Sequence, residues 1–442
     1  MKKTFIVVLC LCLLIAAFSG CNQGGKPSEA SGTSEDVSSL SETPDSQSNE
    51  EKPDKISVIS GAETAPAYEI VAKEYTETYG VEVEMIVDAY DNIRNKIITA
   101  ATSGSTEDLG LLDTVWPAEF LAAGIAYPLN EFITEEKISQ FVPVSIDQLT
   151  VDGKIMGLPF INDTKWLYYN DALLEAGGYE NPPATWEEAI EMSEDLVNQG
   201  LVKYGTAWGA SQAEGLVCDW AALVCSFGGN WYDESGEWAL NSENAVDALT
   251  MMTDSLNNGF ADPASITYSD RTVLNSLMAK DIAFTLNWSY AWGVTNNDEE
   301  SNVVGDIKIG LVPGSKKYGT KSGSTPGGGG LCILQNSDAK EWAYKFLDMI
   351  TEPDFQAESI EISSNVPVIT SVFEDSAVLE KYPYLVDCAP QYEFEMFRPQ
   401  VAQYSEWSNI MQQNIHSALT GAASPKDALD KAQQEVTAQI AE

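Results

Sequence analysis

Residues 153–187 read GKIMGLPFINDTKWLYYNDALLEAGGYENPPATWE and couple a turn, a short strand and two helices. Leu158-Pro159 requires extended backbone, because proline disfavours the helical region for the residue before it. The apolar, aromatic run Leu167-Tyr168-Tyr169 predicts a buried strand. A strand, a helix, a Pro-Pro turn and a second helix are therefore predicted in succession.

The two helices of this stretch are predicted from their end signals. Asn170 or Asp171 can cap the first helix, which ends at Gly177-Gly178 because glycine adopts the left-handed conformation of a helix end at little energetic cost. Thr185 is a good N-cap for the second helix, and Glu188, three residues on, completes a capping box.

Strands and helices also alternate before this stretch, which predicts an α/β fold with a largely parallel sheet and helices on both faces. Residues 113–116 follow the last of these strands, at the carboxyl edge where ligands bind in open α/β sheets. The predicted elements are strands over 56–60, 81–87 and 109–112 and helices over 66–79 and 91–102.

The amino terminus has the pattern of a bacterial lipoprotein signal. Two lysines precede an apolar run over 4–18, and Ser19-Gly20 supplies small residues before Cys21. We expect a signal peptide over 1–20 and lipid on Cys21, although Phe18 stands where leucine is usual. An ordinary secretory signal or an uncleaved anchor is the alternative, but the apolar run is shorter than the ~20 residues of a membrane-spanning helix.

Residues 22–54 are dominated by polar, acidic, Pro and Gly residues, with only Ala30, Val37 and Leu40 as apolar members. Such a segment cannot bury enough apolar surface to offset the entropy of ordering, so it predicts a flexible tether. With lipid on Cys21, the segment 21–54 is expected to hold a folded body at the extracytoplasmic face of the bacterial cell membrane.

Composition and charge limit the possible functions. Of the 442 residues 44% are hydrophobic, so the chain can bury a sizeable core in two or three domains. The formal net charge of −43 repels phosphate backbones, and nucleic acid is therefore excluded as a partner.

The cysteine and histidine content gives no sign of a metal or a cofactor. After removal of the signal and lipidation of Cys21, four cysteines remain without paired CxxC spacing, and His416 is the single histidine. No nucleophilic triad can be built without His416, and no nucleotide-binding glycine loop is present. An enzyme would have to use carboxylates, as glycoside hydrolases do. Whether any of the four cysteines pair is left open: Cys218, Cys225, Cys332 and Cys388.

Further segments occur in an order that resembles one family. Together with the opening stretch, they resemble bacterial extracellular solute-binding protein family 1, the trehalose/maltose-binding-like lipoproteins of carbohydrate ABC importers. The resemblance covers nearly the whole chain from Ile56 onward. The segments are 215–220, 226–231, 284–292, 327–334, 337–356, 365–368, 398–404 and 421–429.

The resemblance implies a two-lobed, periplasmic-binding-protein-like α/β fold of type II. Each lobe would be a mostly parallel sheet flanked by helices, and the chain would cross between lobes three times, near 162–165, 311–314 and 363–368. The expected division is a signal peptide over 1–20, a lipidated cysteine and disordered linker over 21–54, a first lobe of 55–162 plus 314–363, and a second lobe of 163–313 plus 364–442.

Sugar recognition requires flat aromatic faces for the pyranose and polar groups for its hydroxyl rim, all in one cleft. Trp288 and Tyr290 are separated by one residue, so they would emerge on the same side if residues 284–287 end a strand. The resemblance implies that these two rings form the stacking platform. Packing of both rings in the core is the alternative.

The resemblance also implies the polar ligand residues. Asp113 and Asp163 match the hydroxyl-binding carboxylates of the family, and Trp116 is expected to line the cleft beside Asp113 or to pack on the following helix. Glu63 or Thr64, in the loop after the first strand, is expected to contribute as well.

Two further candidates lie near the carboxyl end of the chain. Arg398 is expected in the cleft, with a structural salt bridge as the alternative. Gly329 belongs to the glycine run 327–330, where the family commonly places an aromatic residue after paired glycines. We therefore expect one stacking wall to be missing and the cleft to accept a different or larger sugar.

These inferences predict a monomeric, membrane-anchored binding protein rather than an enzyme. It would capture a di- or oligosaccharide between two lobes and deliver it to an ABC permease that a separate ATPase powers, with no cofactor of its own. The alternatives are a binding protein for a non-sugar polar solute, such as an amino acid or polyamine, and a glycoside hydrolase with Asp113 and Asp163 as its carboxylate pair.

Overall fold

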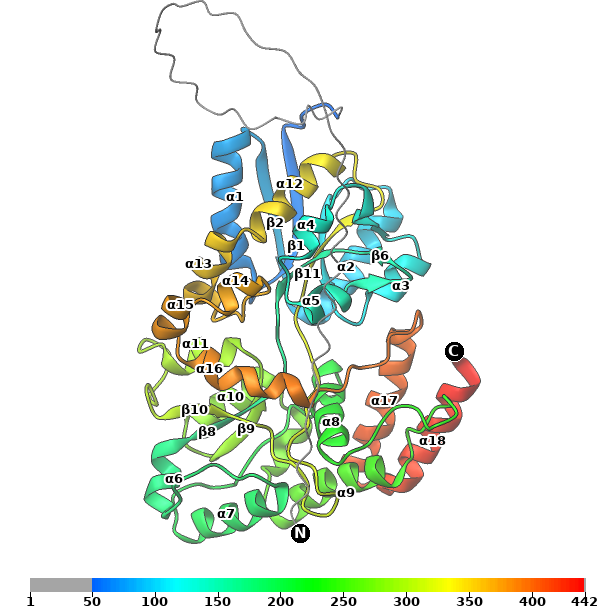
Figure 1. The fold of residues 1–442 in the computed structure, drawn as a ribbon. Helices are drawn as coiled ribbons and strands as arrows, with labels where there is room; N and C mark the ends of the chain where they lie inside the picture. Colours follow the sequence, from blue (N-terminus) through cyan, green and yellow to red (C-terminus); the bar gives the residue numbers. More distant parts are fainter. Residues whose placement is uncertain (1–49, 441–442) are drawn as a thin grey trace, which may run out of the picture. The chain divides into compact units, whose positions relative to one another are not determined.

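The computed structural model describes residues 50–440, which belong to one compact unit (Figure 1). The expected signal peptide over 1–20, the lipidated Cys21 and the linker as far as residue 49 lie outside the described residues. Within residues 50–440, no helix is both long and apolar enough to cross a membrane.

The first sheet is mixed and has the order β2-β1-β3-β11-β4, with β7 also paired to β11. β1 is parallel to β2 and β3, as the strand–helix alternation predicts, because each strand is followed by a helix that returns the chain to the same edge. The strands are β1 (Lys55–Gly61), β2 (Glu82–Asp88), β3 (Leu109–Asp113), β4 (Ala126–Tyr127), β7 (Leu158–Ile161) and β11 (Gly329–Leu334).

Helices pack on this sheet: α1 contacts β2, α12 and α13, whereas α2 contacts β1 and β3. We call this sheet with its helices the first lobe. Its other elements are α1 (Ala65–Tyr79), α2 (Tyr90–Ser103), α3 (Pro117–Ala122), η1 (Leu129–Glu131), α4 (Glu135–Ile138), α5 (Pro143–Asp147), β5 (Thr150–Val151), β6 (Lys154–Ile155), α12 (Lys340–Ile350), α13 (Pro353–Ser363) and α14 (Thr370–Phe373). The next helix, α15 (Ser376–Lys381), lies in the chain that leads to the second lobe.

The second sheet has the order β10-β8-β9 and is antiparallel throughout. We call this sheet with its helices the second lobe. Its elements are β8 (Trp166–Asn170), α6 (Asp171–Gly177), α7 (Trp186–Asn198), α8 (Glu214–Ser226), α9 (Glu243–Asn258), η2 (Pro263–Thr267), α10 (Asp270–Met278), β9 (Phe284–Asn287), α11 (Tyr290–Asn296), β10 (Ile307–Gly310), α16 (Tyr384–Cys388), η3 (Ala389–Phe394), α17 (Tyr404–Leu419) and α18 (Pro425–Gln439).

The expectation of a mostly parallel sheet holds in the first lobe, where β11 alone runs against the other strands, and is wrong in the second lobe, whose sheet is antiparallel. Gly329 pairs with Asp113, so β11 begins where β3 ends and must run in the opposite direction. Trp166 pairs with Asn287, so β8 begins where β9 ends. In each lobe, the strand that follows a connecting segment pairs with a strand that ends near that segment, so the two are antiparallel. These pairs are β11 with β3 and β8 with β9.

The caps predicted in the opening stretch are confirmed. The Asn170 side chain accepts a hydrogen bond from Leu173 N, and the Thr185 side chain accepts one from Glu188 N. Gly178 ends α6 with φ of +91°, in the left-handed region that favours glycine. Local end signals thus define both helices.

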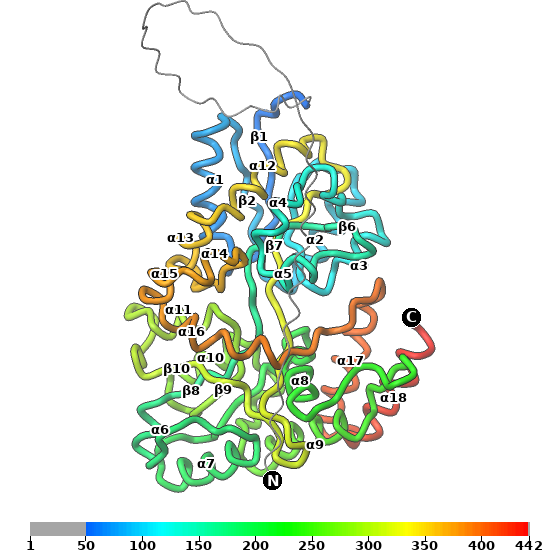
Figure 2. The backbone as a smooth tube through the Cα atoms, viewed as in Figure 1, coloured from blue at the N-terminus to red at the C-terminus, as the bar shows by residue number. Residues whose placement is uncertain are grey.

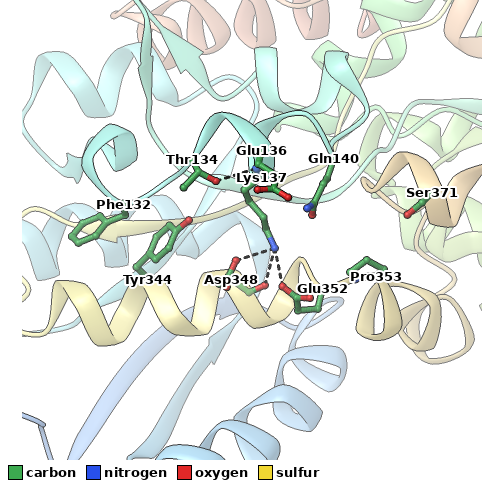
Figure 3. A pocket seen from close by; sticks show the side chains of 10 residues that line it. All are labelled: Phe132, Thr134, Glu136, Lys137, Gln140, Tyr344, Asp348, Glu352, Pro353 and Ser371. Carbon is green, nitrogen blue, oxygen red and sulfur yellow. Dashed lines mark hydrogen bonds and ion pairs between the residues drawn. The ribbon is translucent and has the colours of Figure 1, made fainter. Parts of the chain in front are cut away.

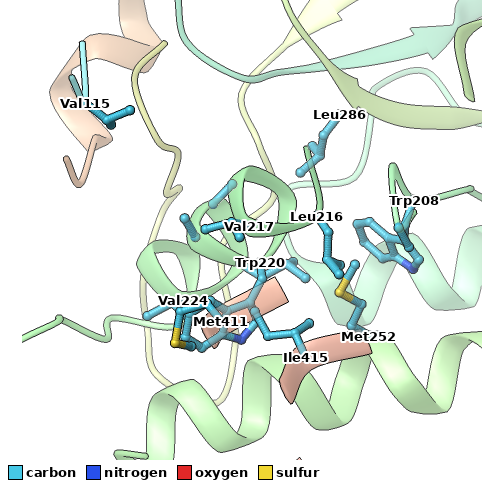
Figure 4. Close-up of a cluster of buried hydrophobic side chains, with 14 of the residues drawn as sticks. Val115, Trp208, Leu216, Val217, Trp220, Val224, Met252, Leu286, Met411 and Ile415 are labelled. Carbon is cyan, nitrogen blue, oxygen red and sulfur yellow. The ribbon is translucent and has the colours of Figure 1, made fainter. Parts of the chain in front are cut away.

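A buried cluster of apolar side chains holds α8 in the second lobe. In Figure 4 the side chains of Leu216 and Trp220 lie among those of Met252 of α9 and of Met411 and Ile415 of α17, and all five residues are buried. Because α8 is enclosed in this way, its first turn is held in a defined position beside the cavity that follows. The four cysteines within the described residues are free.

Three segments connect the two lobes, and Figure 2 traces the first two between the sheets. Thr164 forms an antiparallel bridge with Pro326, and Ser324 forms a parallel bridge with Glu395. The first two segments therefore contact each other, and the second also pairs with the chain directly after η3. The three segments are residues 162–165 between β7 and β8, residues 324–328 before β11, and the chain between α14 and α16.

Hydrogen bonds lie next to the second and third crossings that the sequence predicts. Near 311–314, the carbonyl of Gly314 still accepts a hydrogen bond from the first residue of α7. Near 363–368, the carbonyl of Val368 still accepts a hydrogen bond from Val142 in the first lobe. In both places the chain pairs with the lobe that it is leaving before it crosses.

Candidate functional site

A cavity of about 450 Å³ is lined by residues of both lobes and of the connecting segments. The first lobe contributes the carboxyl ends of β1 and β3 and the start of α2, and the second contributes the starts of α8, α10 and α11. Most of the expected ligand residues line it: Glu63, Thr64, Asp113, Asp163, Trp288, Tyr290, Gly329 and Arg398.

Trp116 does not line the cavity. It is 5% exposed, and its ring stacks on Tyr90 at 5.9 Å and on Phe120 at 5.7 Å between ring centroids. Tyr90 itself lines the cavity, so Trp116 supports the wall from behind. The expectation that Trp116 contacts the ligand is replaced by the packing role, because its ring is covered on two sides.

Trp288 and Tyr290 follow β9 and line the same cavity. The Trp288 indole is held by two neighbours: Nε1 donates to Asp270 Oδ2 at 2.9 Å, and the ammonium of Lys165 lies 4.7 Å from the ring centroid. A Cβ on Gly327 would lie 2.4 Å from Cζ3 of the indole, so glycine is required for this close approach. The arrangement leaves part of the indole surface to the cavity.

Asp163 joins the first connecting segment to the start of α11. Its Oδ1 accepts from the backbone N–H groups of Thr164 and Ser289, both at 3.0 Å, and its Oδ2 accepts from the Ser289 hydroxyl at 3.1 Å. Burial raises the pKa of the Asp163 carboxyl to about 7, against the lowering effect of these hydrogen bonds.

Asp113 and Arg398 form a network rather than a pair of free groups. Asp113 Oδ2 accepts from the Tyr90 hydroxyl at 2.7 Å, and Arg398 Nη2 lies 3.7 Å from Asp113 Oδ1. Arg398 Nη1 donates to Glu214 Oε1 at 2.6 Å, and its side chain is 2% exposed. The structural salt bridge weighed for Arg398 is thus present, at a residue that also lines the cavity.

Several cavity residues were missed by sequence reasoning: Tyr90, Asp91, Glu214, Asp270 and Arg271. Asp270 and Arg271 follow the N-cap Ser269, so the local pattern marks only a helix start. Glu214 is 184 residues from its partner Arg398, and no local signal connects the two. The burial of Tyr90 raises the pKa of its hydroxyl far above the usual value, so it remains a hydrogen-bond donor to Asp113.

Protonation of Asp163 and Glu395 predicts a measurable pH effect. Burial raises the pKa of Glu395 to about 8 and that of Asp163 to about 7, whereas an unfolded chain releases both protons near the ordinary carboxyl pKa. Between the ordinary carboxyl pKa and these raised values, the folded protein therefore binds more protons than the unfolded chain. Its free energy of unfolding falls as the pH rises through the folded pKa. Between about pH 5 and about pH 7, Asp163→Asn should gain stability relative to wild type as the pH rises.

Urea unfolding of wild type and Asp163→Asn across that pH range checks this prediction. Glu395→Gln is the matched comparison, and its gain should extend to a pH about one unit higher, through about 8 rather than about 7. A difference between wild type and Asp163→Asn that does not change with pH would contradict the assignment.

The chain forms two sheet-and-helix lobes, joined by three connecting segments, and both lobes line one cavity. This is the fold of the type II periplasmic binding proteins, a class that binds solutes. Residues 60–357 match the family model for bacterial extracellular solute-binding proteins, and the chain belongs to this family. Both the resemblance and the fold class are thereby confirmed. The protein is a solute-binding component of an ABC transporter, and its family fits an extracytoplasmic location.

Relatives support this assignment over most of their length. A probable ABC transporter-binding protein of Deinococcus radiodurans is 28% identical over 336 residues, 74% of this chain and 78% of the relative. The structure of maltose-bound T. maritima MalE3 has a TM-score of 0.82 and 29% identity over 87% of this chain and 100% of its own. A ribitol complex of an Agrobacterium radiobacter solute-binding protein, TM-score 0.79, covers 87% of this chain and 98% of its own at 24% identity and shows the fold alone.

Proposed function

We propose that this solute-binding protein captures a sugar, a di- or oligosaccharide, in the cavity between its lobes and delivers it to the permease of an ABC transporter. The observation that carries the proposal is the presence of Trp288 and Tyr290 in one cavity with several carboxylates and Arg271. The maltose found with the similar MalE3 structure supports the same ligand class.

The aromatic and the charged side chains of the cavity would contact different parts of a sugar. The indole of Trp288 and the ring of Tyr290 would pack on the C–H face of a pyranose, as aromatic rings do in apolar contacts. Glu63 and Asp91 are exposed carboxylates on the first-lobe side, and Arg271 is exposed on the second-lobe side. These charged groups would accept from and donate to sugar hydroxyls, since charge-assisted hydrogen bonds are short and strong.

Closure of the lobes is part of this proposal. A ligand that contacts Glu63 and Trp288 together touches both lobes, so it favours the closed arrangement by the difference in its affinity for the two states. We propose lobe boundaries at the connecting segments 162–165, 324–328 and the chain between α14 and α16, near the boundaries expected from sequence.

The protein would act by binding alone, without turnover of the sugar, and as a monomer. Lipid on Cys21 and the acidic tether after it would keep the binding unit at the membrane, where the permease lies. The family consists of binding proteins, which supports a role without catalysis.

A thermal-shift screen of the full chain tests the ligand class. The panel contains maltose, maltotriose and other mono-, di- and oligosaccharides, together with amino acids and polyamines, and every hit is checked for product formation. At about 100 times its dissociation constant a true ligand adds about 2.7 kcal/mol to the free energy of unfolding. We expect stabilisation by one class of sugar with no product; stabilisation by amino acids or polyamines alone would refute the sugar, and product formation would refute binding without catalysis.

A further inference from the structure

Beside the indole of Trp288 lies a charged cluster to which the proposed function assigns no separate role, although one of its members, Asp270, also lines the cavity. Lys165 is fully buried, and its ammonium lies 2.7 Å from Asp219 Oδ1 and 2.8 Å from Asp270 Oδ1. The same ammonium lies 4.7 Å from the centroid of the Trp288 ring. Asp270 uses its other oxygen, Oδ2, to accept from Trp288 Nε1 at 2.9 Å. We call Lys165, Asp219 and Asp270 the Lys165 triad.

We propose that the Lys165 triad is a positioning device for Trp288, which holds the indole in the orientation that presents its remaining surface to the ligand. The inference rests on the proposed function, because it concerns how the stacking platform is offered to a sugar. It adds Lys165, Asp219 and Asp270 as residues that act through Trp288.

The geometry restrains the indole at two points. The hydrogen bond to Asp270 fixes the edge that carries Nε1, and the ammonium of Lys165 lies over the ring. An indole N–H is a donor only, and a charged acceptor makes its hydrogen bond stronger than a neutral one would. The attraction of the Lys165 ammonium to the ring adds a second restraint on rotation of the indole about its side-chain torsions.

The packing around Asp270 is adapted to this arrangement. A Cβ on Gly209 would lie 2.6 Å from Asp270 Oδ1, so a larger residue there would displace the carboxylate. Gly209 N also donates to Asp219 Oδ2 at 2.8 Å, which orients the second acid. Burial alone would lower the pKa of Lys165, but attraction by Asp219 and Asp270 outweighs it and raises the pKa, so the ammonium stays charged.

The triad also ties the platform to the connection between the lobes. Lys165 ends the connecting segment 162–165, Asp219 lies in α8, and Asp270 begins α10. The ammonium therefore joins the start of the second sheet to two helices whose first turns face the cavity. A merely structural ion pair would serve the same elements without holding the indole, and the experiment separates these two roles.

The experiment uses fluorine NMR of the full chain labelled with 5-fluorotryptophan, in the absence of ligand. Loss of one resonance in Trp288→Phe assigns the signal of Trp288. Asp270→Ala removes the acceptor of the indole N–H and leaves Lys165 paired with Asp219. The double variant Lys165→Met/Asp219→Asn removes the ammonium together with one carboxylate, so the net charge of the triad is unchanged.

A similar lysine in the first lobe supplies the matched control (Figure 3). The ammonium of Lys137 lies 2.9 Å from Asp348 Oδ1 and 3.0 Å from Glu352 Oε1, and its side chain is 10% exposed. This lysine lines a separate hollow of about 600 Å³, outside the lining of the ligand cavity. The variant Lys137→Met/Asp348→Asn therefore makes the same chemical change away from Trp288.

We expect one sharp Trp288 resonance in wild type and in the Lys137 control, and a broadened or split one in both triad variants. A Trp288 resonance with unchanged shift and width in Asp270→Ala would overturn the proposal, and this variant decides the matter if the double variant does not fold. Titration with maltotriose should show about a tenfold loss of affinity in Asp270→Ala, the scale of a hydrogen bond to a charged acceptor. If wild type does not bind maltotriose, that choice of sugar fails, while the spectra without ligand still test the positioning of Trp288.

Discussion

Trp288→Ala is expected to weaken the binding of maltotriose roughly 100-fold, because removing an indole that packs on the sugar forfeits about 2–3 kcal/mol of apolar contact. Trp288 is only partly buried in the ligand-free protein, and its inner contacts are with Lys165, Asp270 and Gly327. The loss should therefore appear mainly in affinity. Isothermal titration calorimetry, with thermal unfolding of the same samples, measures both quantities.

Trp292→Ala is the matched control for this prediction. Trp292 is also partly buried and lies in α11, but its ring stacks on Tyr384 at 5.0 Å between centroids and does not line the cavity. This control should lose some stability and keep its affinity for maltotriose. Equal losses of affinity in Trp288→Ala and Trp292→Ala would mean that the stacking platform has been misassigned.

Gly329→Ala is expected to lower the free energy of unfolding by about 3 kcal/mol or more, through backbone strain together with overpacking. Gly329 has φ of +122°, which residues with a side chain rarely adopt, and its Cβ would lie 2.2 Å from the carbonyl oxygen of Leu112. It pairs with Asp113 and lines the cavity, so relief of the clash would shift the carboxyl end of β3. Urea unfolding gives the loss of stability, and sugar affinity should fall with it.

Gly236→Ala separates the two causes of that loss. Gly236 has φ of +89°, but a Cβ there meets no atom within 4 Å, so only backbone strain remains. Its expected cost is about 1 kcal/mol. If Gly329→Ala proves no worse than Gly236→Ala, the close approach of β11 to β3 does not constrain the site.

The glycine run also bears on the missing stacking wall. An aromatic residue at Gly329 or Gly330 is excluded sterically, since a Cβ on Gly330 would lie 1.8 Å from the carbonyl oxygen of Leu158. At Gly327 the edge of the Trp288 indole occupies the space that a side chain would need, because Cζ3 lies 2.4 Å from the position of a Cβ. The wall is therefore absent because three strands and an indole meet at this run, and we expect the cavity to bind its sugar with fewer aromatic faces.

Much of the local structure could be predicted from the sequence. The caps of Asn170 and Thr185 and the early strands and helices depend on neighbours a few residues away, so composition and spacing reveal them. Trp288 and Tyr290 could be placed together because one residue separates them after a short strand. The lipoprotein signal is likewise a local pattern, and it stays a prediction.

Other features depend on contacts that span most of the chain. The direction of β11, the network of Arg398 with Glu214 and the packing of Trp116 behind Tyr90 could not be predicted from local patterns. The Lys165 triad was missed for the same reason, since Asp270 lies 105 residues from Lys165.

The sequence by itself determined the family, the helix ends and the residue types available for a sugar site. Only the tertiary structure decided which carboxylates are engaged internally, which remain exposed in the cavity, and how the indole of Trp288 is held. The physical reason is that caps and strands are stabilised by interactions between near neighbours, whereas burial, ion pairing and cavity shape depend on which distant segments the core brings together.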